Sequence, residues 1–164
     1  MSEISQWMKK IEELKKGEAD LSRDEDLSIG IMNLISLEEH LFFTAMKTND
    51  AKYLELLNQI RSIRKQMLAK IVTNPQGEEW CISKHLLAAS MRLMEVGTKE
   101  LSTKNAKEAM PYFQHSFDLY SLFFGINLKL LDTQKLKTDA GVKVGMMKRI
   151  SGIVKEVIDC CKEV

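Results

Sequence analysis

The sequence of 164 residues is poor in the two residue types that interrupt helices, with only 2 Pro and 8 Gly. A β fold rich in turns needs more of both, so these low counts favour helices, as do 10 Met and abundant Leu and Lys. An excess of charge of one sign is also absent, because 24 Lys and Arg face 23 Asp and Glu. Non-specific binding to polyanions needs surplus cations, so the balance argues against nucleic acid as a partner.

Cysteine and long apolar runs are scarce as well. An odd cysteine count with two adjacent residues is a poor disulfide framework and fits a reducing compartment. The first ten residues lack the charged-then-apolar layout of a signal peptide. The most apolar stretch, 119–131, contains glycine, asparagine and lysine and is shorter than the ~20 residues of a membrane span. We therefore expect a soluble, cytoplasmic protein without a membrane span. The cysteines are Cys81, Cys160 and Cys161.

Turn signals divide the chain into segments with helical periodicity. Short loops between them predict that successive helices pack antiparallel. We expect an all-α, single-domain antiparallel helical bundle of five to six helices over residues 1–164. Its parts are a short N-terminal helix (1–17), a charged connector (18–26), a four-helix core (27–131) and a C-terminal helix (139–162). Within the core, helices are expected at about 27–48, 51–72, 78–101 and 105–131.

Two charged residues fall inside predicted apolar stripes. Glu38 lies in the middle of the stripe of the 27–48 helix, and Arg64 lies in that of the next helix. Folding the two helices back at Asn49–Asp50 brings Arg64 within about one turn of Glu38, with Arg61 also near. We expect Glu38 to pair with Arg64 or with Arg61 inside the bundle, because a charge buried alone costs ~3–5 kcal/mol. Such a pair either selects one helix arrangement or belongs to a polar ligand pocket.

Aromatic residues gather on two of the predicted helices. Phe42 flanks the apolar stripe of the 27–48 helix together with Met46, and Phe117 lies in the apolar face of the 105–131 helix with Met110. We therefore expect these two helices to supply the aromatic part of the core. Pro111 lies past the first turn of the later helix, which predicts a kink or a start nearer Met110.

Two sets of small residues are candidates for close packing or for an interface. The first recurs every seven residues on the apolar side of the 78–101 helix, where it would let a neighbouring helix approach closely. The second lines one side of the last helix, where each glycine costs ~1 kcal/mol relative to alanine, so a backbone, for example that of a symmetry partner, is expected to approach there. A frayed helix start explains Gly141 and Gly145 equally well. The sets are Ser83, Ser90 and Gly97, and Gly141, Gly145 and Gly152.

One constellation has the spacing of metal ligands. Cys81 and His85 lie one helical turn apart, and His115 with Asp118 could supply two further ligands from the following helix. Isolated polar residues on helix edges explain the same four positions, and neither pair belongs to a dense ligand cluster. The chain contains no Glu-x-x-His motif of di-iron bundles. We therefore expect no metal and no cofactor, and keep the four-residue site as the alternative.

Residues 105–119 resemble the second helix of a tetratricopeptide repeat, with Ala109, Tyr112 and Phe117 in fitting positions and Gly97 matching the glycine of the preceding helix. The match covers one unit of ~34 residues, whereas a solenoid needs at least three. We interpret this segment as an ordinary helical hairpin. A P-loop, a nucleophile elbow and a Rossmann glycine fingerprint are absent from the sequence.

The sequence favours a non-catalytic interaction or scaffold protein, with a protein partner or a second copy docking on a glycine-lined or Met-rich face. The alternative is a bundle that binds a small molecule or metal, or an enzyme, with its site around Glu38 and Arg64 or around Cys81 and His85. A binding bundle should hold a cavity in which these polar groups meet a ligand. A scaffold should show them bonded to one another.

Overall fold

The computed structural model describes residues 21–103, 105–131 and 144–157, together with Lys9, Glu12, Glu13 and Lys16. These ranges contain helices and no strand, and the helices pack against one another, which confirms the predicted all-α fold. The predicted N-terminal helix and the ends of the predicted C-terminal helix lie outside the described residues, apart from those four. The helices are α2 (Ser22–Thr48), α3 (Lys52–Ile71), α4 (Glu79–Ser102), α5 (Ala106–Asn127) and α6 (Val144–Val157).

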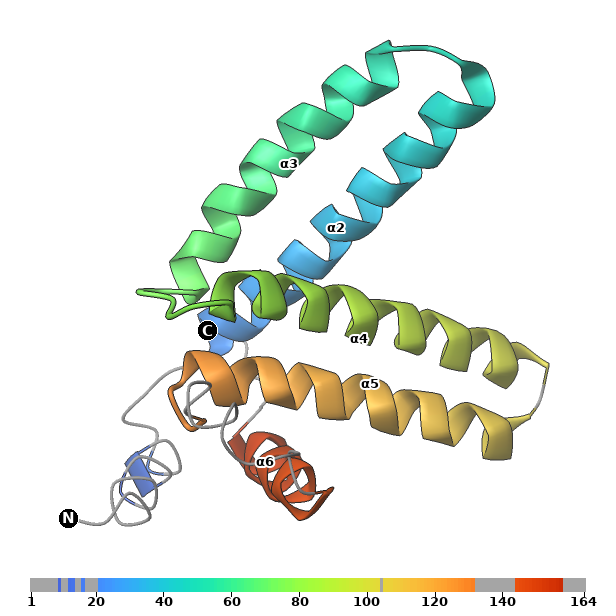
Figure 1. Cartoon of the computed structure of the whole chain (residues 1–164). Coiled ribbons are helices and arrows are strands. Elements are labelled where there is room, and N and C mark those ends of the chain that lie inside the picture. Colours follow the sequence, from blue (N-terminus) through green and yellow to red (C-terminus); the bar gives the residue numbers. More distant parts are fainter. Residues whose placement is uncertain are drawn as a thin grey trace.

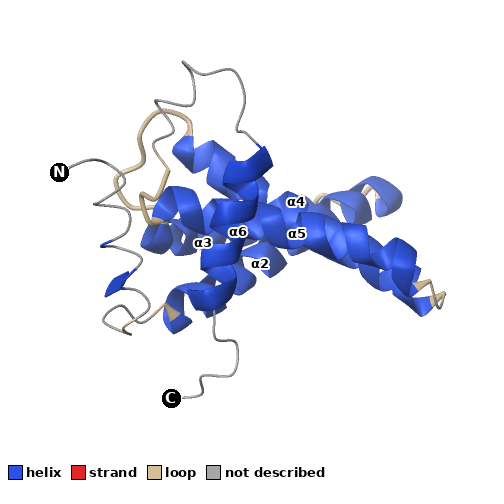
Figure 2. Ribbon diagram, turned by 90° about the horizontal axis from the view of Figure 1, so that it is seen from below, coloured by secondary structure: helices blue, strands red, loops and turns tan. Residues whose placement is uncertain are grey.

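Four of the helices form two antiparallel hairpins, α2 with α3 and α4 with α5 (Figure 1). The hairpins meet where α2 passes α4 and diverge from there, so that the connection between α2 and α3 projects away from the rest of the molecule. Helix α6 packs against α5 (Figure 2). Among the described helices, the far half of the first hairpin therefore packs only through its own two helices.

Local sequence signals explain the turns and caps. Asn49 adopts the left-handed conformation with φ 51°, and the Asp50 carboxylate accepts a hydrogen bond from the backbone N–H of Lys52 at 3.0 Å. Asparagine tolerates the left-handed conformation, and an aspartate side chain can bond to the backbone two residues further on. The turn predicted at Asn49–Asp50 is therefore present. Asn105 caps α5, because its side-chain oxygen accepts a hydrogen bond from the Glu108 N–H at 3.3 Å.

Two helix starts differ from the prediction. Helix α2 begins at Ser22, so the last residues of the expected charged connector are helical. Asp24 and Glu25 lie in the first turn, where negative charge is favourable next to unpaired N–H groups. Helix α5 begins at Ala106 and contains Pro111, so a start nearer Met110 is wrong. A proline this close to a helix start removes only one backbone hydrogen bond.

The hydrophobic core lies at the base of the two hairpins, and all five helices contribute to it. Its buried aromatic members come from α5, where the Phe123 and Phe124 rings meet edge to face at 5.2 Å, and Trp80 of α4 packs against it. The prediction that α2 supplies aromatic residues to the core is wrong, because Phe42 is exposed on the projecting half of that helix. Met110, expected to be buried, is also exposed. Core residues include Ile31, Met32, Leu68, Ile71, Leu86, Leu87, Phe123, Phe124, Ile126, Ile150 and Val154.

A buried hydroxyl pair connects α2 to α5. The Ser28 hydroxyl donates to the backbone carbonyl of Glu25 at 2.6 Å, and its oxygen lies 2.6 Å from the Tyr120 hydroxyl. Because the single Ser28 proton is used, Tyr120 is the donor in this contact. Burial raises the pKa of Tyr120 to about 12.

The raised pKa of Tyr120 predicts a loss of stability at high pH. The folded state favours the neutral phenol, so this contribution is intact below the ordinary pKa of 10 and is lost as pH rises from 10 towards 12. Between pH 9 and 11 we expect the wild-type protein to lose about 1 kcal/mol more unfolding free energy than Tyr120→Phe, which has no proton to lose at this position. Urea unfolding of both proteins across this range measures the difference. Parallel pH profiles would contradict the burial of this phenol.

Candidate functional site

Glu38 and Arg64 form a hydrogen-bonded ion pair between α2 and α3. Arg64 donates from Nε to Glu38 Oε1 at 2.8 Å and from Nη2 to Oε2 at 3.4 Å. The Arg64 side chain is 3% exposed and that of Glu38 is 14% exposed. The structure thus forms the first of the two expected pairs, and Arg61, the alternative partner of Glu38, is exposed instead. Because both carboxylate oxygens already face the guanidinium, the geometry is that of a structural link between the two helices.

The four candidate metal ligands are not brought together. Cys81, His85 and His115 are exposed, whereas Asp118 accepts hydrogen bonds from Gln114 of its own helix and from Ser151 of α6 at 2.7 Å. The Asp118 carboxylate thus binds α6, while Cys81 and His85 lie on α4. Within the described ranges, no three His, Cys, Asp or Glu residues lie close enough to hold a metal ion.

The first set of small residues is used inside the chain, between α4 and α5. Ser90 and Ser116 each donate a hydrogen bond to the backbone carbonyl of the other, at 2.8 and 2.7 Å. Ser83 accepts a hydrogen bond from the Asn127 amide. At Gly97 a Cβ atom would lie 2.9 Å from the Phe113 ring, so a side chain there would collide with α5. These residues let α4 and α5 approach closely.

The second set of small residues is represented in the described structure by Gly152, and no close helix contact is seen there. Gly152 is exposed, and a Cβ atom there would meet nothing within 4 Å, so no described part of the chain approaches it closely. Gly141 and the surroundings of Gly145 lie outside the described residues. The close contact of α6 is at Gly125 of α5, where a Cβ atom would lie 3.1 Å from Ile150. In the sequence, Gly125 is only an interruption of an apolar stretch, and its role depends on where α6 packs.

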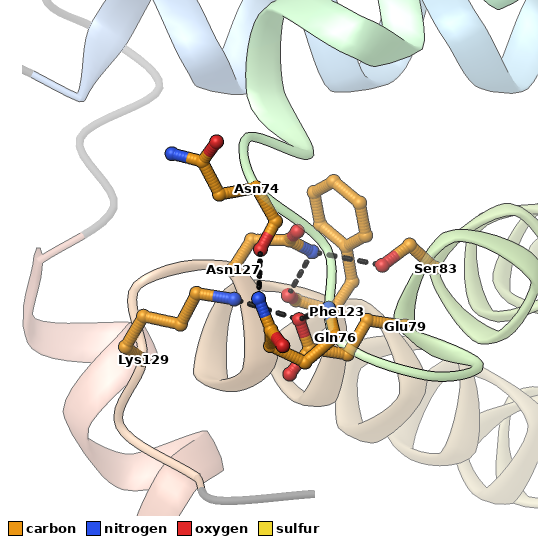
Figure 3. Close-up of polar contacts among 7 residues, drawn as sticks. All are labelled: Asn74, Gln76, Glu79, Ser83, Phe123, Asn127 and Lys129. Atoms are coloured by element: carbon orange, nitrogen blue, oxygen red, sulfur yellow. Dashed lines mark hydrogen bonds and ion pairs between the residues drawn. The ribbon is translucent and has the colours of Figure 1, made fainter.

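A polar cluster joins the loop before α4 to the end of α5 (Figure 3). The buried Glu79 carboxylate accepts hydrogen bonds from Lys129 Nζ at 2.7 Å and from the Gln76 backbone N–H at 2.9 Å. Nearby, the Asn127 amide donates to Ser83 and to the Phe123 carbonyl. Lys129 has φ 55°, a left-handed conformation that L side chains rarely adopt. No sequence signal distinguishes Glu79 from the adjacent Glu78, because the partner of Glu79 is fifty residues away.

A groove of about 440 Å³ lies where the hairpins diverge, between α2 and α4. Arg92 of α4 spans it, donating to Ser36 Oγ at 2.7 Å and pairing with Glu39 at 3.4 Å. The Arg92 and Glu39 side chains are about half exposed, so this link between the hairpins is in contact with water. The groove is lined by Ser36, Leu37, Glu39, His40, Phe43 and Arg92.

Exposed large apolar side chains lie on both sides of the projecting α2–α3 hairpin, and those on one side include its two phenylalanines. At 100° per residue, Phe42, Met46 and Phe43 lie about 40°, 80° and 140° around α2 from Glu38. Leu54 is displaced by about 80° in the same sense from Arg64, which in an antiparallel partner helix places it on the same side. We call these four residues the aromatic flank. Their exposed fractions are 45% for Phe42, 57% for Phe43, 57% for Met46 and 43% for Leu54.

The aromatic flank continues a face that is buried nearer the base of α2. Met32 lies about 120° from Glu38 in the same sense and is buried in the core. Phe43 lies at the edge of the groove, beyond which α4 no longer covers this face, and the exposed Phe42 and Phe43 rings meet edge to face at 5.2 Å. The flank is therefore an apolar face without a neighbour among the residues that the structure describes.

Comparisons with models of protein families, with curated proteins and with solved structures find no match for this chain. A search of the described helices for a membrane span finds none with the length and apolar content to cross a bilayer.

Proposed function

We propose that this chain is a non-catalytic interaction protein that docks onto another protein through the aromatic flank. The observation that supports this most directly is the exposure of two adjacent phenylalanines and a methionine on a projecting hairpin. Single exposed apolar residues are ordinary, but contiguous ones mark contact sites. Aromatic residues and methionine are also enriched in the buried centres of protein interfaces.

The buried polar groups support an interaction protein over a bundle that binds a ligand in its interior. Glu38 is bonded to Arg64, and Ser90 to Ser116. In the described part of the chain, no buried side-chain nitrogen or oxygen lacks a hydrogen-bond partner. An interior ligand site would keep such groups available for the ligand. We also propose a cytoplasmic location, which the free, exposed thiol of Cys81 supports because it fits a reducing compartment.

Two methionines provide a test within one molecule. Met46 lies on the aromatic flank, and Met110, which is 63% exposed, lies near the start of α5 on the other hairpin. Peroxide oxidises exposed methionines, and a docked protein protects those it covers. In cells that make the protein, we expect Met46 to be oxidised at least several-fold more slowly than Met110. In dilute purified protein, the two should react at similar rates. Peptide mass spectrometry measures both rates in the same sample.

Met110 controls for the dose of oxidant and for general crowding, because it is exposed to a similar degree. If Met46 and Met110 are oxidised at the same rate both in cells and in dilute solution, nothing covers the flank and the proposed function is wrong.

A further inference from the structure

Resting on the proposed function, we infer that the occupant of the aromatic flank is a second copy of this chain. The two copies pack flank to flank about a two-fold axis, so that each hairpin contributes α2 and α3 to an intermolecular four-helix arrangement. In such an isologous contact the same residues of both copies form the interface, so each residue of the flank occurs in it twice. Three observations support a second copy over a different protein.

The first observation is the apolar area. A large side chain buries ~150–250 Å², so four side chains that are about half exposed offer roughly 400 Å² per copy. Two copies would then bury roughly 800 Å² of apolar surface. A standard stable interface buries about 1,600 Å², of which somewhat over half is apolar. The apolar area that two flanks would bury together is thus close to the apolar area of a standard stable interface.

The second observation is the charge around the flank. Apart from the Glu38–Arg64 pair, the hairpin between Leu37 and Lys65 carries three acidic and four basic residues, without an excess that would select a strongly acidic or basic partner. A surface with both signs in balance does not repel its own copy. The residues are Glu39, Asp50 and Glu55, and Lys47, Lys52, Arg61 and Lys65.

The third observation is that the hairpin is half of a common packing unit. Two antiparallel helices bury one stripe each against the other and leave an adjacent face open, which four-helix bundles cover with a second helix pair. The Glu38–Arg64 pair fixes the register of α2 and α3, so the two arms present the flank as one surface before docking. A preformed surface loses less conformational freedom when it binds.

Sedimentation of the purified full chain tests this inference. We expect the wild-type protein to dimerise in the micromolar range or below, and Phe43→Ser with Met46→Ser to raise the dimer dissociation constant at least 30-fold, as loss of an interface hot spot does. The matched control is Met110→Ser, an equally exposed methionine on the other hairpin, which should dimerise like wild type. Circular dichroism checks that each variant is folded, which their exposure predicts.

The outcomes separate this inference from the proposed function. A wild-type monomer at all concentrations up to ~100 μM, with Met46 protected in cells, means that the flank binds a different protein and overturns the second copy alone. A monomer with unprotected Met46 overturns both. A dimer that the flank variant leaves unchanged places the contact elsewhere and also overturns the inference. A dimer lost in the flank variant and kept in Met110→Ser supports it.

Discussion

Replacing Glu38 with glutamine should lower the free energy of unfolding by about 3–5 kcal/mol. The substitution keeps the size of the side chain but removes the charge that neutralises Arg64. Because the Arg64 side chain is only 3% exposed, its guanidinium would remain buried without a counter-charge. Urea unfolding followed by circular dichroism measures the change.

The adjacent residue is a matched control for this prediction. Glu39 also pairs with an arginine, Arg92, but both side chains are about half exposed. Glu39→Gln should therefore cost less than about 1 kcal/mol. The double variant Glu38→Met with Arg64→Met should recover most of the loss, because apolar residues often replace a buried pair at little cost. A loss below about 0.5 kcal/mol in Glu38→Gln would mean that water, and not Arg64, surrounds this carboxylate.

Replacing Lys129 with alanine should cost about 1.5–3 kcal/mol, because a charge-assisted hydrogen bond to the buried Glu79 carboxylate is lost. The contact joins the end of α5 to the first turn of α4, so the two helix ends should lose stability together. Thermal or urea unfolding measures the total cost. Amide hydrogen exchange at Gln76, whose N–H is bonded to the same carboxylate, reports the local effect.

Glycine at the same position separates the charge from the backbone conformation. Lys129 has φ 55°, which costs an L residue about 1 kcal/mol and glycine almost nothing. Lys129→Gly should therefore be about 1 kcal/mol more stable than Lys129→Ala, although both lack the ammonium group. Equal stability of the two variants would contradict the left-handed backbone, and an alanine variant as stable as wild type would contradict the ion pair.

The helices and the buried ion pair could be predicted because their signals are local. Hydrophobic periodicity and the Asn49–Asp50 turn set which faces of α2 and α3 meet. One charged residue in each apolar stripe, at distances from that turn that differ by about one helical turn, then specifies the partners. The seven-residue spacing of Ser83, Ser90 and Gly97 predicted a close helix contact in the same way, and the structure shows that α5 makes it.

The aromatic flank could not be predicted, because periodicity shows which residues are apolar but not which neighbour covers them. Phe42 and Met46 lie beside a buried stripe and would be covered in a closed four-helix bundle. They are exposed because α4 leaves α2 at the groove and the two hairpins diverge. Glu79 and Gly125 were missed for a related reason, since each acquires its role from a residue distant in sequence, Lys129 and Ile150.

The ratio of the oxidation rates of Met46 and Met110 tests the docking role of the flank most directly. It compares two similarly exposed methionines on different hairpins of the same molecule. The ratio should be near one in dilute purified protein and should fall several-fold in cells that make the protein. A ratio that stays near one in both settings would show that the phenylalanines of the hairpin face water in the cell, and that the flank has no partner.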